Sequence, residues 1–143
     1  MATSRTVLVL TGPEDPTADA VISEITRRGI RVARHDLGDF PARASLSAIH
    51  DSDGWSGRIT GTDATTNLDE VVAVYYRRPS RFTFPPGMSD VDRAYAEAEA
   101  RLGVGGVLTA LGGSITPTTS HGRSGNHCSW KSPARQGWPP RSH

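Results

Sequence analysis

The sequence predicts an α/β protein with a small, doubly wound, mainly parallel sheet, a β-hairpin insertion and a disordered C-terminal tail. Three observations carry this prediction. Short, nearly all-apolar runs occur at residues 6–10 and 71–76, and helical periodicity follows each of them. Asp, Glu, Leu and Val are all absent after residue 111. Unbroken apolar runs are typical of parallel strands that are covered on both faces.

The first elements form a β-α-β unit. The run "TVLVL" at residues 6–10 is expected to be the central strand, and "TGPEDP" then turns the chain. Asp15 is a suitable N-cap, Pro16 suits the first helical position, and Gly29 supplies a stop. The stretch "IRVARHD", residues 30–36, is the second predicted strand.

A hairpin and a third apolar strand follow. Alternating residues over 42–60 predict two half-exposed strands with a turn at residues 52–54. The run "VVAVYY", residues 71–76, is predicted to be a core strand. Proline has no backbone donor, so Pro79 should end the pairing of this strand.

The last predicted element is a helix that begins after Ser89. Ser89 is its N-cap, Asp92 occupies the capping-box position, and the glycines at 103, 105 and 106 should weaken the second half or allow close approach of another backbone. Its predicted apolar face consists of Val91, Tyr95, Ala98 and Leu102.

Length and composition indicate one domain, residues 1–111, and a tail, residues 112–143. The chain has 143 residues and a net charge of +1, divided into about −3 in the domain and +4 in the tail. The single cysteine, Cys128, excludes an internal disulfide and fits a reducing compartment. The apolar N-terminal run is too short for a signal peptide or membrane span. We therefore expect a cytoplasmic protein with no membrane association.

The stretch "AVYYRRPSRFTFPPG", residues 73–87, contains the best candidates for a binding site. Ligands in doubly wound sheets bind beyond the carboxyl ends of strands, and Arg suits forked recognition of carboxylate or phosphate. Arg77 and Arg78 point to opposite sides of a strand, so one can face a cleft while the other pairs with an acid. With Tyr76 they are the predicted binding residues. The alternative is that the arginine forms a strand-end ion pair and the aromatics belong to the core.

The remaining sequence motifs give no indication of a cofactor-binding or nucleic-acid-binding site. The first loop lacks the GxGxxG and GxxxxGK[ST] patterns, and Glu14 and Asp15 would oppose an anion at the start of the first helix. Four cations over 32 tail residues are a weak footprint for nucleic acid. Four tail residues could ligate a metal, but their spacing matches no standard zinc pattern, so no metal site is predicted: His121, His127, Cys128 and His143.

Four segments resemble a known family. They are "VLVLTGPEDPTADAVI", "RRGIRVARHDLGDFPA", "GWSGRI" and "LDEVVAVYYRRPSRFTFPPGMSDVDRAYAEAEARLGVGGVL". Together they cover most of the first 111 residues. In order and spacing they resemble the N-terminal pre-ATP-grasp domain, a Rossmann-like fold, of ATP-grasp ribosomal-peptide maturases. These are the microviridin-type and actinobacterial graspetide ligases.

The resemblance implies an enzyme family that uses ATP and magnesium. Such ligases activate side-chain carboxylates of a ribosomal precursor peptide and close ester or amide links. Their nucleotide and metal ligands lie in central and C-terminal domains to which nothing in this chain corresponds. The resemblance therefore implies an inactive fragment with no catalytic residue and no cofactor of its own. One face of it would normally be covered by the missing central domain, and we expect poor solubility.

The tail departs from the family in a way that suggests a frameshift. If each true codon takes the last base of one written codon and the first two of the next, His127 and Cys128 must give leucine. A re-translation of residues 113–132 on this rule permits a sequence close to the family's continuation. We therefore expect residues 112–143 to be an out-of-frame product of a pseudogene or a sequencing error.

Three functional hypotheses remain. The first is an amputated ligase without activity, and the second is a non-catalytic module that binds a precursor peptide or a partner synthetase. The third, a stand-alone nucleotide-binding protein, is disfavoured by the missing phosphate loop.

Overall fold

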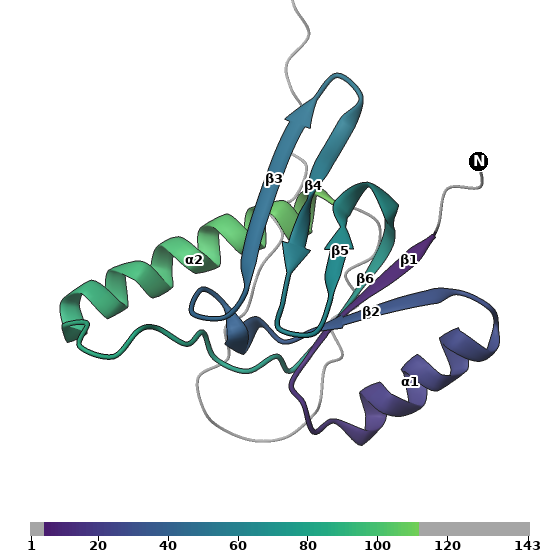
Figure 1. Ribbon diagram of the computed structural model, residues 1–143, viewed down its shortest axis with the longest axis horizontal. Coiled ribbons are helices and arrows are strands. Elements are labelled where there is room, and N and C mark those ends of the chain that lie inside the picture. The colour runs from purple at the N-terminus through teal and green to yellow at the C-terminus, as the bar shows by residue number, and fades with distance from the viewer. Residues whose placement is uncertain (1–4, 112–143) are drawn as a thin grey trace, which may run out of the picture.

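The computed structural model describes residues 5–111 (Figure 1). The predicted tail lies outside the described residues, together with the tail histidines and the cysteine considered above. In chain order the strands, α-helices and short 3₁₀ helices (η) are β1 (Thr6–Thr11), α1 (Pro16–Arg27), β2 (Arg31–His35), η1 (Leu37–Asp39), β3 (Ser45–Asp51), β4 (Gly54–Thr60), β5 (Thr65–Asn67), η2 (Leu68–Glu70), β6 (Val71–Arg77) and α2 (Asp90–Ala110). Within residues 5–111, no helix combines the length and the apolar character needed to cross a bilayer.

The first sheet is parallel and has the strand order β2-β1-β6. The prediction that β1 is central is confirmed, and Leu8, Val9 and Leu10 are fully buried. Strand alternation directs Leu8 and Leu10 to one face and Val9 and Thr11 to the other. Asp15 caps α1 as predicted, because its carboxylate accepts hydrogen bonds from the first amides of the helix.

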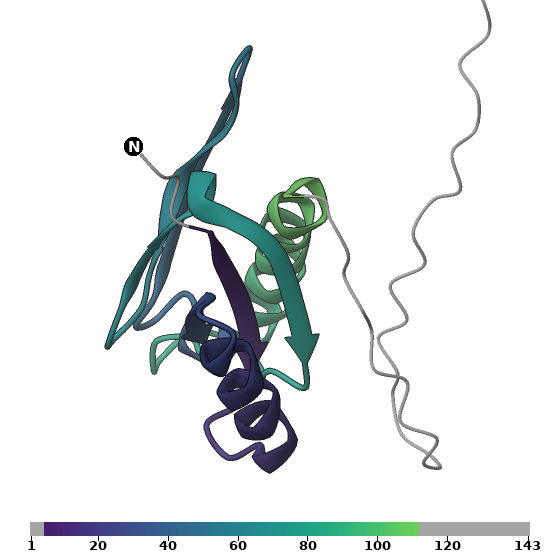
Figure 2. The same ribbon diagram turned by 90° about the vertical axis from the view of Figure 1, so that its right-hand side faces the viewer.

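The hairpin is confirmed but belongs to a sheet of its own. Strands β3 and β4 are antiparallel, and β4 also pairs with β5, a strand that the sequence did not reveal. The hairpin projects from the body of the molecule in both views (Figure 2). The fold is therefore an α/β arrangement of one three-stranded parallel sheet and one three-stranded antiparallel sheet.

Strand β6 is less enclosed than a core strand should be. Val74 is 5% exposed, whereas Val72 is 48% exposed. Within residues 5–111, β6 pairs only with β1 and is thus an edge strand. The register shift opposite Thr6 and Val7 places an extra residue, Val72, in β6 as a bulge.

The predicted apolar face of α2 is wrong. Val91, Tyr95 and Leu102 are exposed, and the buried residues of the helix are Val104 and Leu108. The glycine-rich second half of α2 is therefore continuous helix and is the half that packs. The core cluster joins α2 to both sheets and consists of Leu8, Leu10, Ile59, Leu68, Val74, Val104 and Leu108.

Candidate functional site

Arg77 lies at the carboxyl end of β6, opposite Thr11 of β1. Its Nε donates to both carboxylate oxygens of Asp15, at 2.8 Å to Oδ2 and 3.1 Å to Oδ1. The two side chains are only 13% and 11% exposed. Arg77 thus forms an ion pair with an acid of the first loop, one of the two roles expected for the paired arginines.

Asp15 is almost saturated with hydrogen bonds. Its Oδ1 also accepts from the amides of Thr17 (3.0 Å) and Ala18 (3.1 Å), and Thr11 Oγ1 donates to Oδ2 at 3.4 Å. The Ala18 amide and then Arg77 lower the pKa of Asp15 below its ordinary value of 3.8, against the opposing effect of burial. The carboxylate is therefore ionised at neutral pH. It occupies the amides at the start of α1 and leaves little for an external anion.

Arg78 follows with a positive φ of 42°. Its carbonyl accepts a hydrogen bond from the amide of Gly12 at 3.3 Å, which ties the loop after β6 to the loop after β1. Arg78 is exposed, whereas Arg77 is only partly so. The two neighbouring arginines therefore differ, since Arg77 forms a largely buried ion pair and Arg78 is exposed.

Both arginines line one cavity of about 310 Å³ at the carboxyl ends of β1 and β6. The other lining residues belong to the first loop and the start of α1: Gly12, Glu14, Asp15, Pro16 and Thr17. Within the described residues, the terminal nitrogens of Arg77 donate no hydrogen bond. The cavity is at the small end of ligand-pocket volumes. Two guanidiniums at its wall could bind a carboxylate, although two acids balance their charge.

Tyr76 does not line this cavity. It is 39% exposed and lies opposite Leu10, on the face of the sheet that carries the core. The structure thus brings together two of the three predicted binding residues, Arg77 and Arg78, and leaves Tyr76 outside.

Sequence reasoning missed the residues that fix the loops around the site. The Oδ1 of Asp36 accepts from the amides of Gly38 and Ser80, at 3.0 and 2.8 Å. Arg34 donates to the carbonyls of Gly12 and Pro13 and pairs with Asp19. The position of Asp36 in the sequence could have revealed it. Asp36 directly follows β2, so it lies at the same edge of the sheet as the arginines.

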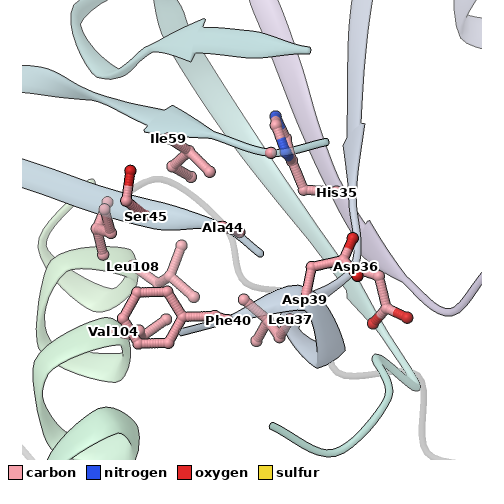
Figure 3. Close-up of a pocket in the computed structure, with 12 residues that line it drawn as sticks. His35, Asp36, Leu37, Asp39, Phe40, Ala44, Ser45, Ile59, Val104 and Leu108 are labelled. Carbon is pink, nitrogen blue, oxygen red and sulfur yellow. The ribbon is translucent and has the colours of Figure 1, made fainter. Parts of the chain in front are cut away.

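A second, smaller cavity lies beside the core, and its lining includes the exposed Ser45. Its volume is about 30 Å³, and Phe40, Val104 and Leu108 lie on one side with His35 on the other (Figure 3). His35 is 8% exposed, and its Nε2 lies 2.8 Å from Thr66 Oγ1. Burial lowers the pKa of His35 below its ordinary value of 6.5. Such a cavity has room for about one water molecule and is a packing gap rather than a ligand site.

The described residues offer no cluster of ligands for the magnesium that the family resemblance implies. Among residues 5–111, no group of three His, Cys, Asp or Glu side chains could hold a metal ion. The helix start beside the larger cavity already carries Asp15 as its own anion. No chemical step through a nucleotide or metal follows from these residues.

Comparison with known proteins identifies the family. The model of the MvdD pre-ATP-grasp domain matches residues 6–120, and the chain belongs to this family. Macrocyclase MdnC from Microcystis aeruginosa MRC, crystallised with the precursor peptide MdnA, is 31% identical with a TM-score of 0.67. The match covers 76% of this chain and 36% of MdnC. No curated protein sequence matches at a significant level.

Two further solved structures share the fold. Macrocyclase MdnB from the same organism is 21% identical with a TM-score of 0.67, over 78% of this chain and 36% of MdnB. A Chryseobacterium gregarium RiPP-associated ATP-grasp ligase, in complex with ADP and a leader and core peptide, is 21% identical with a TM-score of 0.66. That match covers 75% of this chain and 33% of the ligase. The chain thus spans about a third of the length of each structure.

Proposed function

We propose that this chain is the N-terminal part of an ATP-grasp ligase that macrocyclises ribosomally made peptides through side-chain ester or amide bonds. The match to MdnC, 31% identical over 76% of this chain, is the observation that supports the proposal most strongly. The chain spans only 36% of MdnC, and residues 5–111 contain no group of side chains that could hold a metal ion. We infer that the chain alone is inactive and acts in the cytoplasm.

A macrocyclisation assay tests the inference that the chain alone is inactive. The chain is incubated with ATP, magnesium and the precursor peptide encoded beside it, and the peptide mass is followed. Each ring closure removes one water molecule, so an inactive chain leaves the mass unchanged. Loss of water from the peptide would overturn the inference of inactivity.

A second candidate function is a non-catalytic module that binds the precursor peptide or a partner synthetase. The cavity at Arg77 and Arg78 favours it, since guanidiniums can bind the acidic side chains that such a ligase joins. Calorimetry with the precursor peptide distinguishes a binding module from an inert fragment. The same titration with ATP tests the stand-alone nucleotide-binding alternative, which micromolar affinity would revive.

A matched pair of variants locates the binding. Arg78→Asn removes the exposed guanidinium and keeps a residue type that tolerates positive φ. If the cavity binds the peptide, affinity should fall about tenfold or more. Arg58→Asn, at an exposed position on β4, should leave the affinity unchanged. Equal affinities for both variants would remove the cavity from the site.

We also propose that residues 112–143 are translated out of frame. The absence of acidic residues, Leu and Val in this segment supports the proposal, as does the re-translation described above. Sequencing the DNA from about codon 105 to several hundred bases past the stop tests it. A neighbouring frame without any family-like continuation would contradict the frameshift.

A further inference from the structure

Helix α2 is apolar on two nearly opposite sides. The inner side carries Val104 and Leu108, each 5% exposed in the core. The outer side carries Val91, Tyr95 and Leu102, which are 80%, 70% and 64% exposed. At 100° per residue the two sets point in almost opposite directions. A helix that is apolar on both sides is normally enclosed on both, and here only the inner side is covered by residues 5–111.

The outer residues have the spacing of a helix-pairing seam. Val91, Tyr95, Ala98 and Leu102 are separated by four, three and four positions. This is the alternation of the two apolar positions in a heptad, which forms a narrow stripe suited to one other helix. We call these four residues the outer seam. The half of α2 that carries most of the outer seam extends beyond the hairpin (Figure 1), and its Val91 and Tyr95 are exposed.

Charges beside the outer seam indicate the chemistry of the partner. Asp92 and Glu99 lie along one flank, and both are exposed. On the other flank, Arg101 already forms an ion pair with Glu97 within α2. Asp90, also exposed, lies on that second flank, so an approaching helix would meet acidic side chains on both sides, and Arg101 is the one basic residue facing it on either flank. Basic residues at its flanking positions would complement that charge.

We propose that the outer seam binds a single amphipathic helix of another polypeptide, with an apolar stripe and basic flanking residues. A second copy of the chain fits less well. In an antiparallel pair of copies, Asp92 of one helix would meet Glu99 of the other, and like charges oppose pairing. The surface goes beyond the proposed function, because it shares no residue with the arginine cavity and can bind its partner whether or not that cavity binds a peptide.

Two synthetic peptides of three heptads test the proposal. Both have leucine at the two seam positions, and the flanking positions are all lysine in the basic peptide and all glutamate in the acidic one. Fluorescence anisotropy with the full chain should give at least tenfold tighter binding of the basic peptide. The peptide should gain helicity on binding, and affinity should fall with added salt because charges contribute.

Substitutions then assign the binding to the outer seam. Leu102→Glu should lower the affinity for the basic peptide at least tenfold, while an unchanged circular dichroism spectrum shows that the fold survives. Glu99→Lys should reduce the preference for the basic peptide several-fold. Ile49→Glu alters an equally exposed apolar residue on the hairpin and should change nothing.

Three outcomes would overturn the proposal. Equal affinity for the two peptides would remove the charge argument, and unchanged binding by Leu102→Glu would place the site elsewhere. A chain that sediments as a dimer, and becomes monomeric with Leu102→Glu, would make a second copy the occupant. None of these outcomes depends on the macrocyclisation assay, so this inference and the proposed function can fail separately.

Discussion

At the scale of single residues, Asp15 connects three parts of the molecule. Its carboxylate caps α1, pairs with Arg77 of β6 and accepts from Thr11 of β1. One side chain therefore holds the two loops that form the arginine cavity. The same contacts commit Arg77 to a structural role and leave Arg78 as the more available guanidinium.

Replacing Asp15 separates these roles. Asn is as good an N-cap as Asp, so Asp15→Asn should lose the ion pair and keep the cap, whereas Asp15→Ala should lose both. We expect melting temperatures in the order wild type, Asn variant, Ala variant. Equal melting temperatures for wild type and the Asn variant would show that the ion pair adds no stability.

The pH dependence of Asp15 has a defined sign. Its pKa is lower in the folded state, so its stabilisation is present above the unfolded value of 3.8 and is lost as pH falls through the folded pKa. Urea unfolding between about pH 5 and pH 2 should show a smaller loss of stability for Asp15→Asn than for wild type. Parallel curves would contradict the ion-pair argument.

His35 should contribute a second pH dependence in a higher range. Burial lowers its folded pKa below 6.5, so the unfolded chain binds more protons than the folded chain between the two values. Stability should therefore fall as pH drops below about 6.5. Unfolding free energies at pH 8 and 5.5 should differ less for His35→Gln than for wild type. The exposed His50 provides the control, since His50→Gln should retain the full difference.

At the scale of elements, Gly57 shows how the hairpin depends on backbone freedom. Its φ is 131°, and a Cβ there would lie 2.0 Å from the carbonyl oxygen of Ser47 on the partner strand. Any side chain would separate β3 from β4. Gly57, the second glycine of "GWSGRI", is thus required for strand pairing and has no direct role at the arginine cavity.

Two glycine substitutions should change stability in opposite directions. Gly57→Ala should destabilise by more than about 1 kcal/mol, because both the backbone angle and the space are incompatible. Gly103→Ala lies within α2 with no neighbouring atom within 4 Å, and it should stabilise by about 0.5 to 1 kcal/mol. Chemical denaturation of both variants measures these differences, and destabilisation by Gly103→Ala would show an unseen contact on α2.

The two sides of α2 should also respond differently to truncation. Leu108→Ala opens a cavity in the core and should cost about 2 to 5 kcal/mol. Leu102→Ala removes an exposed side chain and should change stability by less than about 0.5 kcal/mol. Similar losses for both would mean that the predicted apolar face was right and that the outer seam is buried in solution.

At the scale of the whole molecule, sequence patterns predicted which segments form helices and strands better than they predicted which faces of those elements are buried. The strand at residues 6–10, the capped helix after Asp15 and the hairpin all follow from local signals. The buried face of α2 could not be chosen, because Val91, Tyr95 and Leu102 have as regular a spacing as Val104 and Leu108. Only the positions of both sheets decide which stripe is inside.

The candidate site was predictable only in part. The position of Arg77 and Arg78 at a strand end followed from the apolar run before them. The partner of Arg77 did not, because Asp15 is 62 residues away and is brought near by parallel pairing of β1 with β6. Arg78 also has a positive φ, which its residue type does not favour. Long-range pairing and an atypical backbone therefore account for what was missed.

The central position of β1 also has a consequence for synthesis on the ribosome. This strand is synthesised well before its partner on one side, β6, which begins at Val71. At about 5 to 20 residues per second, the nascent chain waits roughly 3 to 13 seconds between the two strands. During that interval the edge of β1 that later pairs with β6 has no hydrogen-bonding partner, and the apolar residues Leu8, Val9 and Leu10 are not yet fully covered. The nascent chain should therefore bind ribosome-associated chaperones until residue 77 has emerged.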